Sequence, residues 1–276
     1  VIDVNSEAGV LYIMVDGKKS TDQGSFTLSV QCKCECREPL SSQPNGDKVW
    51  ADDFENYLTG NLAPQSSRWD KWSAGGADAS VANETILGLN KIGFFAGTTT
   101  ARPDLIYKTN NNTTGRFRIS WRTKITTGKK GYFDLLHILP GSSVQNGVIA
   151  YSLDFKETGA GDVILSNGQT GTIVGAKFNY RPGAWINVTN IVDIDKDVVE
   201  LWIDDVYVGT WKFSSSISAN ATTAQRKTLA GISFWAKDAT YSFAVDNICI
   251  WQKKSNCTSP IASSIVYTEK GDKYNN

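Results

Sequence analysis

Alternation of apolar and polar residues between Trp185 and Gly209 constrains the fold more than any other feature of the chain. Apolar residues recur among polar ones at Val188, Ile191, Val199, Leu201 and Ile203, and the last three have the period-two spacing of buried strand positions. The acidic runs Asp193 to Asp197 and Asp204-Asp205 supply chain reversals at the two ends. We expect two facing strands of an antiparallel sheet here, which places any functional surface on a β-sandwich and not in a helix-lined cleft.

The composition also predicts an all-β fold. Aromatic residues make up 11% of the chain, and it has 24 glycines and a single methionine, a balance that favours strands and tight turns over helices. A chain of 276 residues can form one large sandwich domain with appendages. Lys plus Arg and Asp plus Glu both number 28, without a basic stripe, so we expect no nucleic-acid partner. No apolar run approaches the roughly 18 residues that a membrane-spanning helix needs.

Changes in composition divide the chain into four parts. Residues 1–36 contain two strand candidates, GVLYIMVDG and GSFTLSVQC, joined by a polar turn. Residues 37–48 have two prolines and an Asn-Gly, which is typical of a linker. Residues 49–253 alternate short apolar runs with turn signals at the spacing of a sandwich. Residues 254–276 form a polar tail.

Four landmarks of residues 49–253 resemble a known superfamily. They are DDFENY at Asp52 to Tyr57, GRFRISWRTKI at Gly115 to Ile125, the Trp185 to Gly209 block, and FAVDNICIW at Phe243 to Trp251. In this order they resemble the concanavalin A-like lectin and glucanase superfamily, in its laminin-G-like branch. The resemblance implies an antiparallel two-sheet jelly-roll sandwich whose first and last strands are adjacent.

One turn departs from the pattern of that superfamily. Relatives more often have Asp-Gly or Asn-Gly where this chain has Asp204-Asp205. Asp tolerates a positive φ better than most residues other than glycine. We therefore expect position 205 to adopt a positive φ.

The first 36 residues resemble a different family. YIMVDG at Tyr12 to Gly17 and GSFTLSVQC at Gly24 to Cys32 are similar to the last hairpin of a bacterial pre-peptidase C-terminal domain. An isolated hairpin is marginally stable in water. We expect this one to dock on the sandwich, to add a strand to another subunit, or to be a remnant of proteolytic processing.

The resemblance to the lectin superfamily implies a structural calcium ion between the first and last strands. On this chain the implied ligands are Glu55 and Asp246, with Asp53 as a third. Calcium takes several oxygen ligands from carboxylates and backbone carbonyls. The alternative is that these acids are solvated strand ends and turn caps.

Aromatic residues are the candidates for sugar binding. Trp69 and Trp72 lie in the polar stretch SSRWDKWSAGG, where an exposed aromatic platform is plausible, and Tyr132 follows the TTGKKG turn. The alternative for each is a place in the core. We expect the core for the strand tryptophans: Trp121, Trp185, Trp202 and Trp235.

The sequence argues against catalysis. Glycosidases of this fold place paired carboxylates on one strand face, and the E-x-D-x-x-E pattern does not occur. The Asp193, Asp195 and Asp197 cluster is better explained as a solvated turn. The single histidine, His137, lies among Leu and Ile without a G-x-S-x-G nucleophile motif. We expect a protein that is not an enzyme.

The five cysteines form two groups at opposite ends of the chain, namely Cys32, Cys34 and Cys36, and Cys249 and Cys257. The first three share one face of an extended strand. A soft metal is one possibility, but one or two disulfides that staple the hairpin to the domain are favoured. The odd count leaves at least one thiol reduced, ligated or paired with another chain.

These observations lead to one main hypothesis on function and two alternatives. The main hypothesis is a non-enzymatic extracellular or cell-surface protein, bacterial by its hairpin, that binds carbohydrate or mediates adhesion and holds calcium. The first alternative is a structural subunit of an extracellular filament that self-associates through its hairpin by strand addition. The second is an accessory module released from a larger secreted hydrolase or peptidase.

Overall fold

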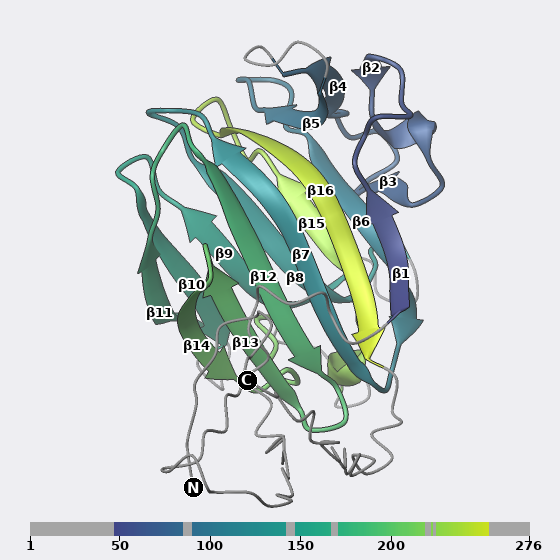
Figure 1. Cartoon of the computed structure of the whole chain (residues 1–276), viewed down its shortest axis with the longest axis vertical. Helices are drawn as coiled ribbons and strands as arrows, with labels where there is room; N and C mark the ends of the chain where they lie inside the picture. The colour runs from purple at the N-terminus through teal and green to yellow at the C-terminus, as the bar shows by residue number, and fades with distance from the viewer. Residues whose placement is uncertain are drawn as a thin grey trace, which may run out of the picture. The chain divides into compact units, whose positions relative to one another are not determined.

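The computed structural model describes residues 47–84, 90–141, 147–166, 171–218, 222 and 225–253. The predicted hairpin at 1–36, nearly all of the linker and the tail at 254–276 lie outside these residues. Helical structure in the described part consists of two 3₁₀ turns, Ala63–Gln65 and Gln225–Lys227. No helix of the described part is long and apolar enough to cross a membrane. The remainder is an antiparallel two-sheet sandwich, as the sequence predicted (Figure 1).

The first sheet has nine strands and lies in front in Figure 1. Its order is β14 (Val206–Trp211), β13 (Val198–Ile203), β12 (Trp185–Asp193), β7 (Arg116–Ile125), β16 (Ser242–Lys253), β5 (Lys91–Ala96), β4 (Ser80–Asn83) and β2 (Gly60–Asn61). The ninth strand, β1 (Asp47–Asp52), pairs with the second half of β16, beyond the part that pairs with β5. The first and last strands of the sandwich are therefore adjacent, which confirms the expectation.

The second sheet has seven strands and lies behind the first. Its order is β11 (Thr172–Asn179), β10 (Ala160–Ser166), β9 (Val148–Phe155), β8 (Gly131–Ile138), β15 (Leu229–Trp235), β6 (Asp104–Asn112) and β3 (Trp69–Lys71). The strands at the centre, β8, β15 and β6, come from distant parts of the chain. Their order places widely separated residues side by side on each face of the sheet.

Aromatic side chains fill the space between the sheets. Phe95 and Phe243 of the first sheet stack with ring centroids 5.1 Å apart, and Phe133 meets Phe243 across the interface at 5.0 Å. Phe234 lies 5.5 Å from Phe133 in edge-to-face contact. All four rings are almost completely buried. Such rings contribute to stability through the apolar area they remove from water and through their edge-to-face geometry.

The stretch from Trp185 to Gly209 contains three strands and not two, because the Asp204-Asp205 turn starts β14. The φ angles of Asp204 and Asp205 are 46° and 63°, which confirms the positive φ expected at position 205. The Asp204 carboxylate also accepts the backbone N–H of Asn187 at 2.8 Å. Paired positive φ angles match the right-handed twist of a two-residue hairpin turn.

The other acids of this region and the histidine have structural contacts. Asp195 accepts the N–H of Gly115 at 3.0 Å, and Asp197 accepts the N–H and hydroxyl of Ser214 at 2.6 and 2.7 Å. His137 is buried, and its Nδ1 lies 3.0 Å from the carbonyl of Thr228. Burial lowers the pKa of His137 to about 4. The imidazole is therefore neutral at physiological pH and belongs to the packing of β8.

Candidate functional site

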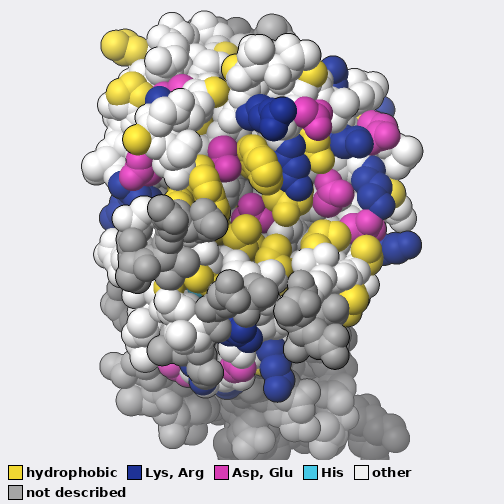
Figure 2. Space-filling model, turned by 180° about the vertical axis from the view of Figure 1, so that it is seen from behind, with side chains coloured by type: hydrophobic (Ala, Val, Ile, Leu, Met, Phe, Trp, Pro, Cys, Tyr) yellow, Lys and Arg dark blue, Asp and Glu magenta, His cyan; other side chains and the backbone are white. Residues whose placement is uncertain are grey.

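Polar and aromatic side chains gather on the outer face of the seven-stranded sheet. Because side chains alternate along a strand, the residues between the inward-facing Phe133, Leu153 and Phe234 point away from the core. The outward set comprises Asp104, Tyr132, Asp134, Ser152, Asp154, Ser233 and Trp235. Figure 2 shows the side opposite to that in Figure 1, with hydrophobic side chains in the middle and charged ones among and around them. We call this surface the outer face.

Hydrogen bonds across the strands fix the middle of the outer face. Tyr132 on β8 donates its hydroxyl to Ser152 on β9 at 2.7 Å, and Ser152 donates to Asp134 at 2.5 Å. On the other side of β8, Ser233 on β15 donates to the carboxylate of Asp104 on β6 at 2.8 Å. The row spans four neighbouring strands, so its polar groups are held in place by the sheet itself.

A single lysine lies over this row. The Nζ of Lys237 is 3.0 Å from the ring centre of Tyr132 and 5.0 Å from that of Trp235. The two rings meet edge to face, with centroids 5.9 Å apart. An ammonium over an aromatic face is held by the ring quadrupole. The lysine thus links the aromatic pair to the carboxylates around it.

Burial shifts the protonation of these charged groups. It raises the pKa of Asp104 to about 7, and the neighbouring Asp134 adds to the effect. It raises the pKa of Asp134 to about 6, although the Ser152 hydrogen bond and the Lys237 charge oppose it. Burial also raises the pKa of Asp154 and lowers that of Lys237. Near neutral pH, Asp104 and Asp134 can exist in either state, so each can donate or accept a hydrogen bond.

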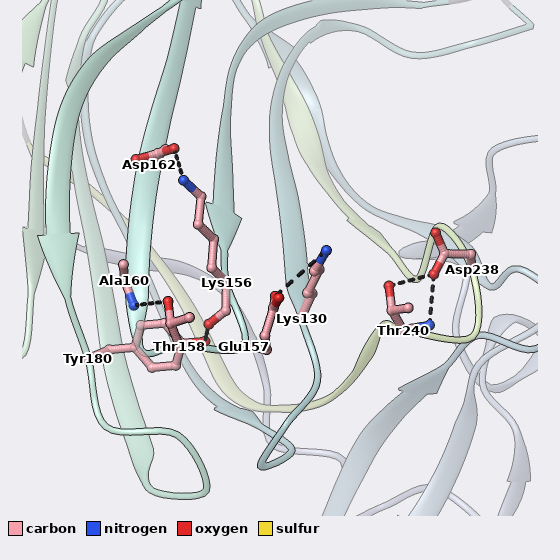
Figure 3. Close-up of polar contacts among 9 residues, drawn as sticks. All are labelled: Lys130, Lys156, Glu157, Thr158, Ala160, Asp162, Tyr180, Asp238 and Thr240. Atoms are coloured by element: carbon pink, nitrogen blue, oxygen red, sulfur yellow. Dashed lines mark hydrogen bonds and ion pairs between the residues drawn. The ribbon is translucent and has the colours of Figure 1, made fainter.

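Ion pairs surround one end of the outer face (Figure 3). Lys156 pairs with Asp162 across the β9–β10 turn, and Lys130 lies 3.6 Å from Glu157. In the β15–β16 loop, Asp238 accepts the N–H and hydroxyl of Thr240 at 2.7 and 2.6 Å. These contacts order the loops that border the face.

The structure places two of the three predicted sugar-binding residues on the outer face. Tyr132 lies at its centre but is only 9% exposed, and Lys237 covers its ring. Trp72 is half-buried and packs on Ile106 and Leu136 at the β6 side. Trp69 lies in the core instead, 3% exposed, with its ring 5.2 Å from Tyr107. Its indole N–H donates to Asp52 at 2.8 Å, which the polar surroundings of Trp69 in the sequence did not reveal.

The strand tryptophans also differ from expectation. Trp121 is in the core, as predicted, but Trp185, Trp202 and Trp235 are only half-buried. The inward neighbours of these three, such as Leu201 and Phe234, occupy the core positions, so the tryptophans face outward.

Sequence reasoning missed Asp104, Asp134, Asp154 and Lys237 and assigned Trp235 to the core. A signal was present in strands β8, β9 and β15, where polar residues occupy alternate positions of otherwise apolar segments. This pattern indicates that one face of these strands packs against the core and that the polar residues lie on the opposite face.

Two of the three residues expected to bind calcium, Glu55 and Asp246, contact Lys91 and Asn90 respectively at the start of β5. The Glu55 carboxylate accepts the backbone N–H of Lys91 at 2.9 Å, and the exposed Asp53 accepts the N–H of Glu55 at 3.3 Å. Asp246 is 1% exposed and accepts from Asn90 Nδ2 at 3.3 Å and the N–H of Asn247 at 2.7 Å. Within the described ranges, no three His, Cys, Asp or Glu side chains come together to hold a metal ion.

Of the five cysteines, the structure describes Cys249. It lies on β16 opposite Ala51 of β1 and Ser120 of β7. Cys32, Cys34, Cys36 and Cys257 lie outside the described residues, so the predicted disulfides stay a prediction.

Comparison with known proteins identifies similar structures and no similar sequence. No protein-family model matches the sequence, and no curated protein matches it. A carbohydrate esterase of Shiga toxin-encoding bacteriophage phi24B is 13% identical, with a TM-score of 0.52, over 76% of this chain and 100% of the esterase chain. The Emp47p carbohydrate recognition domain is 12% identical, with a TM-score of 0.50, over 78% of this chain and 100% of that domain.

A sialidase is also similar, at 14% identity and a TM-score of 0.49, over 77% of this chain. The match covers 19% of the sialidase, so this chain spans about a fifth of its length. At such identities the likeness concerns the fold. The described domain is an antiparallel two-sheet jelly-roll sandwich, the fold that the resemblance in the sequence implied.

Proposed function

We propose that this protein binds carbohydrate through the outer face of its seven-stranded sheet. The observation behind the proposal is the cluster of Tyr132, Trp235 and Lys237 beside the carboxylates of Asp104 and Asp134. Sugar rings present apolar C–H faces and a rim of hydroxyls, which suit aromatic faces next to fixed hydrogen-bonding groups.

The fold adds support to the proposal. One structure with the same fold is named as a carbohydrate recognition domain, and another as a carbohydrate esterase. A fold alone does not define a function, so the argument rests on the outer face. We place the protein outside the cell or at its surface, in an adhesive role, because polysaccharides and glycoconjugates are displayed there.

Binding without catalysis is the form that the geometry favours. Asp134 is 3% exposed and bonded to Ser152, and the Asp104 carboxylate is bonded to Ser233. Asp134 held in this way orders the hydroxyls of Ser152 and Tyr132, and the part-exposed carboxylate of Asp104 is suited to orienting a ligand. The ammonium of Lys237, which lies over the Tyr132 ring, partly balances their charges.

Affinity electrophoresis of the full chain through gels that contain different polysaccharides tests the proposal. We expect retardation in at least one gel without release of reducing ends or acyl groups. Migration unchanged across neutral, acidic and amino-sugar polymers would overturn the proposal. Release of sugars or acyl groups would show that the protein is an enzyme and would overturn the proposal of binding without catalysis.

Self-association is a second candidate function, favoured by the edges of the two sheets. Strands β11 and β14 each end the order of their sheet, and they lie beside each other. In the described part, four of the five strongly exposed large hydrophobic residues are on these strands: Ile173, Val174, Val206 and Tyr207. An exposed apolar edge strand can pair with another chain. A second copy is a suitable partner because the net charge of the chain is zero.

Sedimentation velocity over a range of concentrations tests the assembly. We expect concentration-dependent association that Val174→Lys abolishes. The matched control is Leu58→Lys, at an exposed apolar residue of the β1–β2 loop and not on either edge strand. A monomer at all concentrations, or equal effects of the two variants, would contradict assembly through this edge.

A further inference from the structure

We propose that the ammonium group of Lys91 takes the place of the calcium ion that the lectin-like resemblance implies, so that the domain folds independently of calcium. The proposal concerns the junction of β1, β5 and β16. It is independent of the sugar-binding face, which lies on the other sheet.

The ammonium lies among the oxygen atoms that a hard cation would need. Lys91 Nζ donates to the backbone carbonyl of Glu55 at 2.9 Å and to that of Tyr57 at 2.6 Å. The Glu55 carboxylate accepts the backbone N–H of the same lysine. Calcium binds through carbonyl and carboxylate oxygens, and here one residue already engages three of them.

The neighbouring carboxylates also have cationic partners. Glu84 is buried, lies 3.4 Å from Lys124 Nζ and accepts the indole N–H of Trp185 at 2.7 Å. Asp246 faces Arg122 across the β16–β7 pair. Burial raises the pKa of Asp246, while Asn90, Asn247 and the Arg122 charge oppose that rise. A divalent ion would therefore have to displace protein cations that already balance these acids.

The turn that Lys91 holds is conformationally demanding. Phe54 has a φ of 60° and is 1% exposed, and the N–H of Tyr57 closes the turn on the Phe54 carbonyl at 3.0 Å. A positive φ is unfavourable for a bulky side chain. The two carbonyl contacts of Lys91 tie this turn to β5, so their loss should loosen the start of the sandwich.

Thermal unfolding of the full chain, with millimolar calcium and with a chelator, tests the proposal. For the native sequence we expect a Tm difference below about 1 °C between the two conditions, and no heat of calcium binding in a titration. A Tm rise of several degrees with calcium, together with a binding isotherm, would overturn the proposal. This test needs no variant, so it stands even if substitutions impair folding.

Substitutions at Lys91 test the role of the ammonium. We expect Lys91→Met to lower the Tm by roughly 3 to 8 °C, because two charge-assisted hydrogen bonds are lost. The matched control is Lys129→Met, since the Lys129 ammonium, in the loop between β7 and β8, binds one exposed carbonyl, that of Ala239. Equal effects of the two substitutions would contradict the proposal. Partial recovery of Lys91→Met by calcium would support it, because the vacated carbonyls are then open to the ion.

Discussion

At the level of single residues, Lys237 determines what the outer face presents to a ligand. Its ammonium lies over Tyr132, and the charges of Asp134, Asp154 and Asp104 act on it. The positive charge of Lys237 partly balances the negative charges of these three carboxylates, whose burial without a cationic partner would cost free energy. Charge on this face is therefore shared between groups from β6, β8, β9 and the segment after β15.

The raised pKa of Asp104 predicts a pH effect on stability. The pKa rises from 3.8 to about 7, so the folded protein holds this proton more tightly than the unfolded chain does. The stability contribution is complete below the unfolded value and is lost as the pH rises toward 7. Asp104→Asn removes this titration and keeps an acceptor for Ser233. We expect its free energy of unfolding to fall less than that of the native sequence across this range, by about 1 to 2 kcal/mol after screening by Lys237.

Urea unfolding at several pH values measures this difference. Asp70→Asn on the neighbouring strand β3 is the control, since Asp70 is exposed and pairs with Lys108 at 3.2 Å. Parallel pH profiles for Asp104→Asn and the native sequence would show that Asp104 does not titrate with folding.

At the level of elements, the residues of a tight turn determine how easily the chain adopts the backbone angles that the turn requires. Asp204-Asp205 joins β13 to β14 with two positive φ angles. Glycine adopts such angles without steric cost, whereas in Asp the Cβ atom approaches the backbone carbonyl too closely and destabilises the turn. The Asp204 carboxylate offsets this cost by accepting the N–H of Asn187, and the hydrogen bonds of the described residues include no such bond to the Asp205 carboxylate.

Glycine substitutions in this turn should therefore have unequal effects. We expect Asp205→Gly to raise the free energy of unfolding by about 0.5 to 1 kcal/mol. Asp204→Gly should raise the free energy of unfolding by less than this, or lower it, because the substitution removes the hydrogen bond to Asn187. Chemical denaturation of both variants measures the difference, and a larger gain from Asp204→Gly would refute this explanation.

Elements were predictable from sequence where alternation was regular. Val199, Leu201 and Ile203 identified β13, and FAVDNICIW identified β16. DDFENY marks the end of β1 and the turn that follows it, and the adjacency of the first and last strands was implied by the resemblance. The candidate site was harder to predict because Asp104, Asp134 and Trp235 are brought together by strand order and not by sequence spacing. Trp69 shows the opposite case, since its neighbours in sequence are polar but its neighbours in space are Tyr107 and Phe234.

At the level of the whole molecule, the sandwich assigns different roles to its surfaces. The outer face of the seven-stranded sheet provides the proposed sugar site. The junction of β1, β5 and β16 on the other sheet provides the Lys91 contacts, and the β11 and β14 edges provide the apolar border. Separation of these surfaces means that stability, association and binding can be altered one at a time.

Substitution of one tryptophan on each sheet tests the central claim most directly. Trp235 is on the outer face beside Tyr132, whereas Trp251 is on β16 of the other sheet, beside Arg118. Both are half-buried, so Trp251→Ala is a matched control for Trp235→Ala. The measurement is the dissociation constant from affinity electrophoresis in the polysaccharide that retards the native chain most.

We predict that Trp235→Ala weakens binding at least about tenfold, because loss of an aromatic anchor costs roughly 1.4 kcal/mol or more. Trp251→Ala should bind as the native chain does. Full binding by Trp235→Ala, or a loss confined to Trp251→Ala, would contradict the assignment of the sugar site to the outer face.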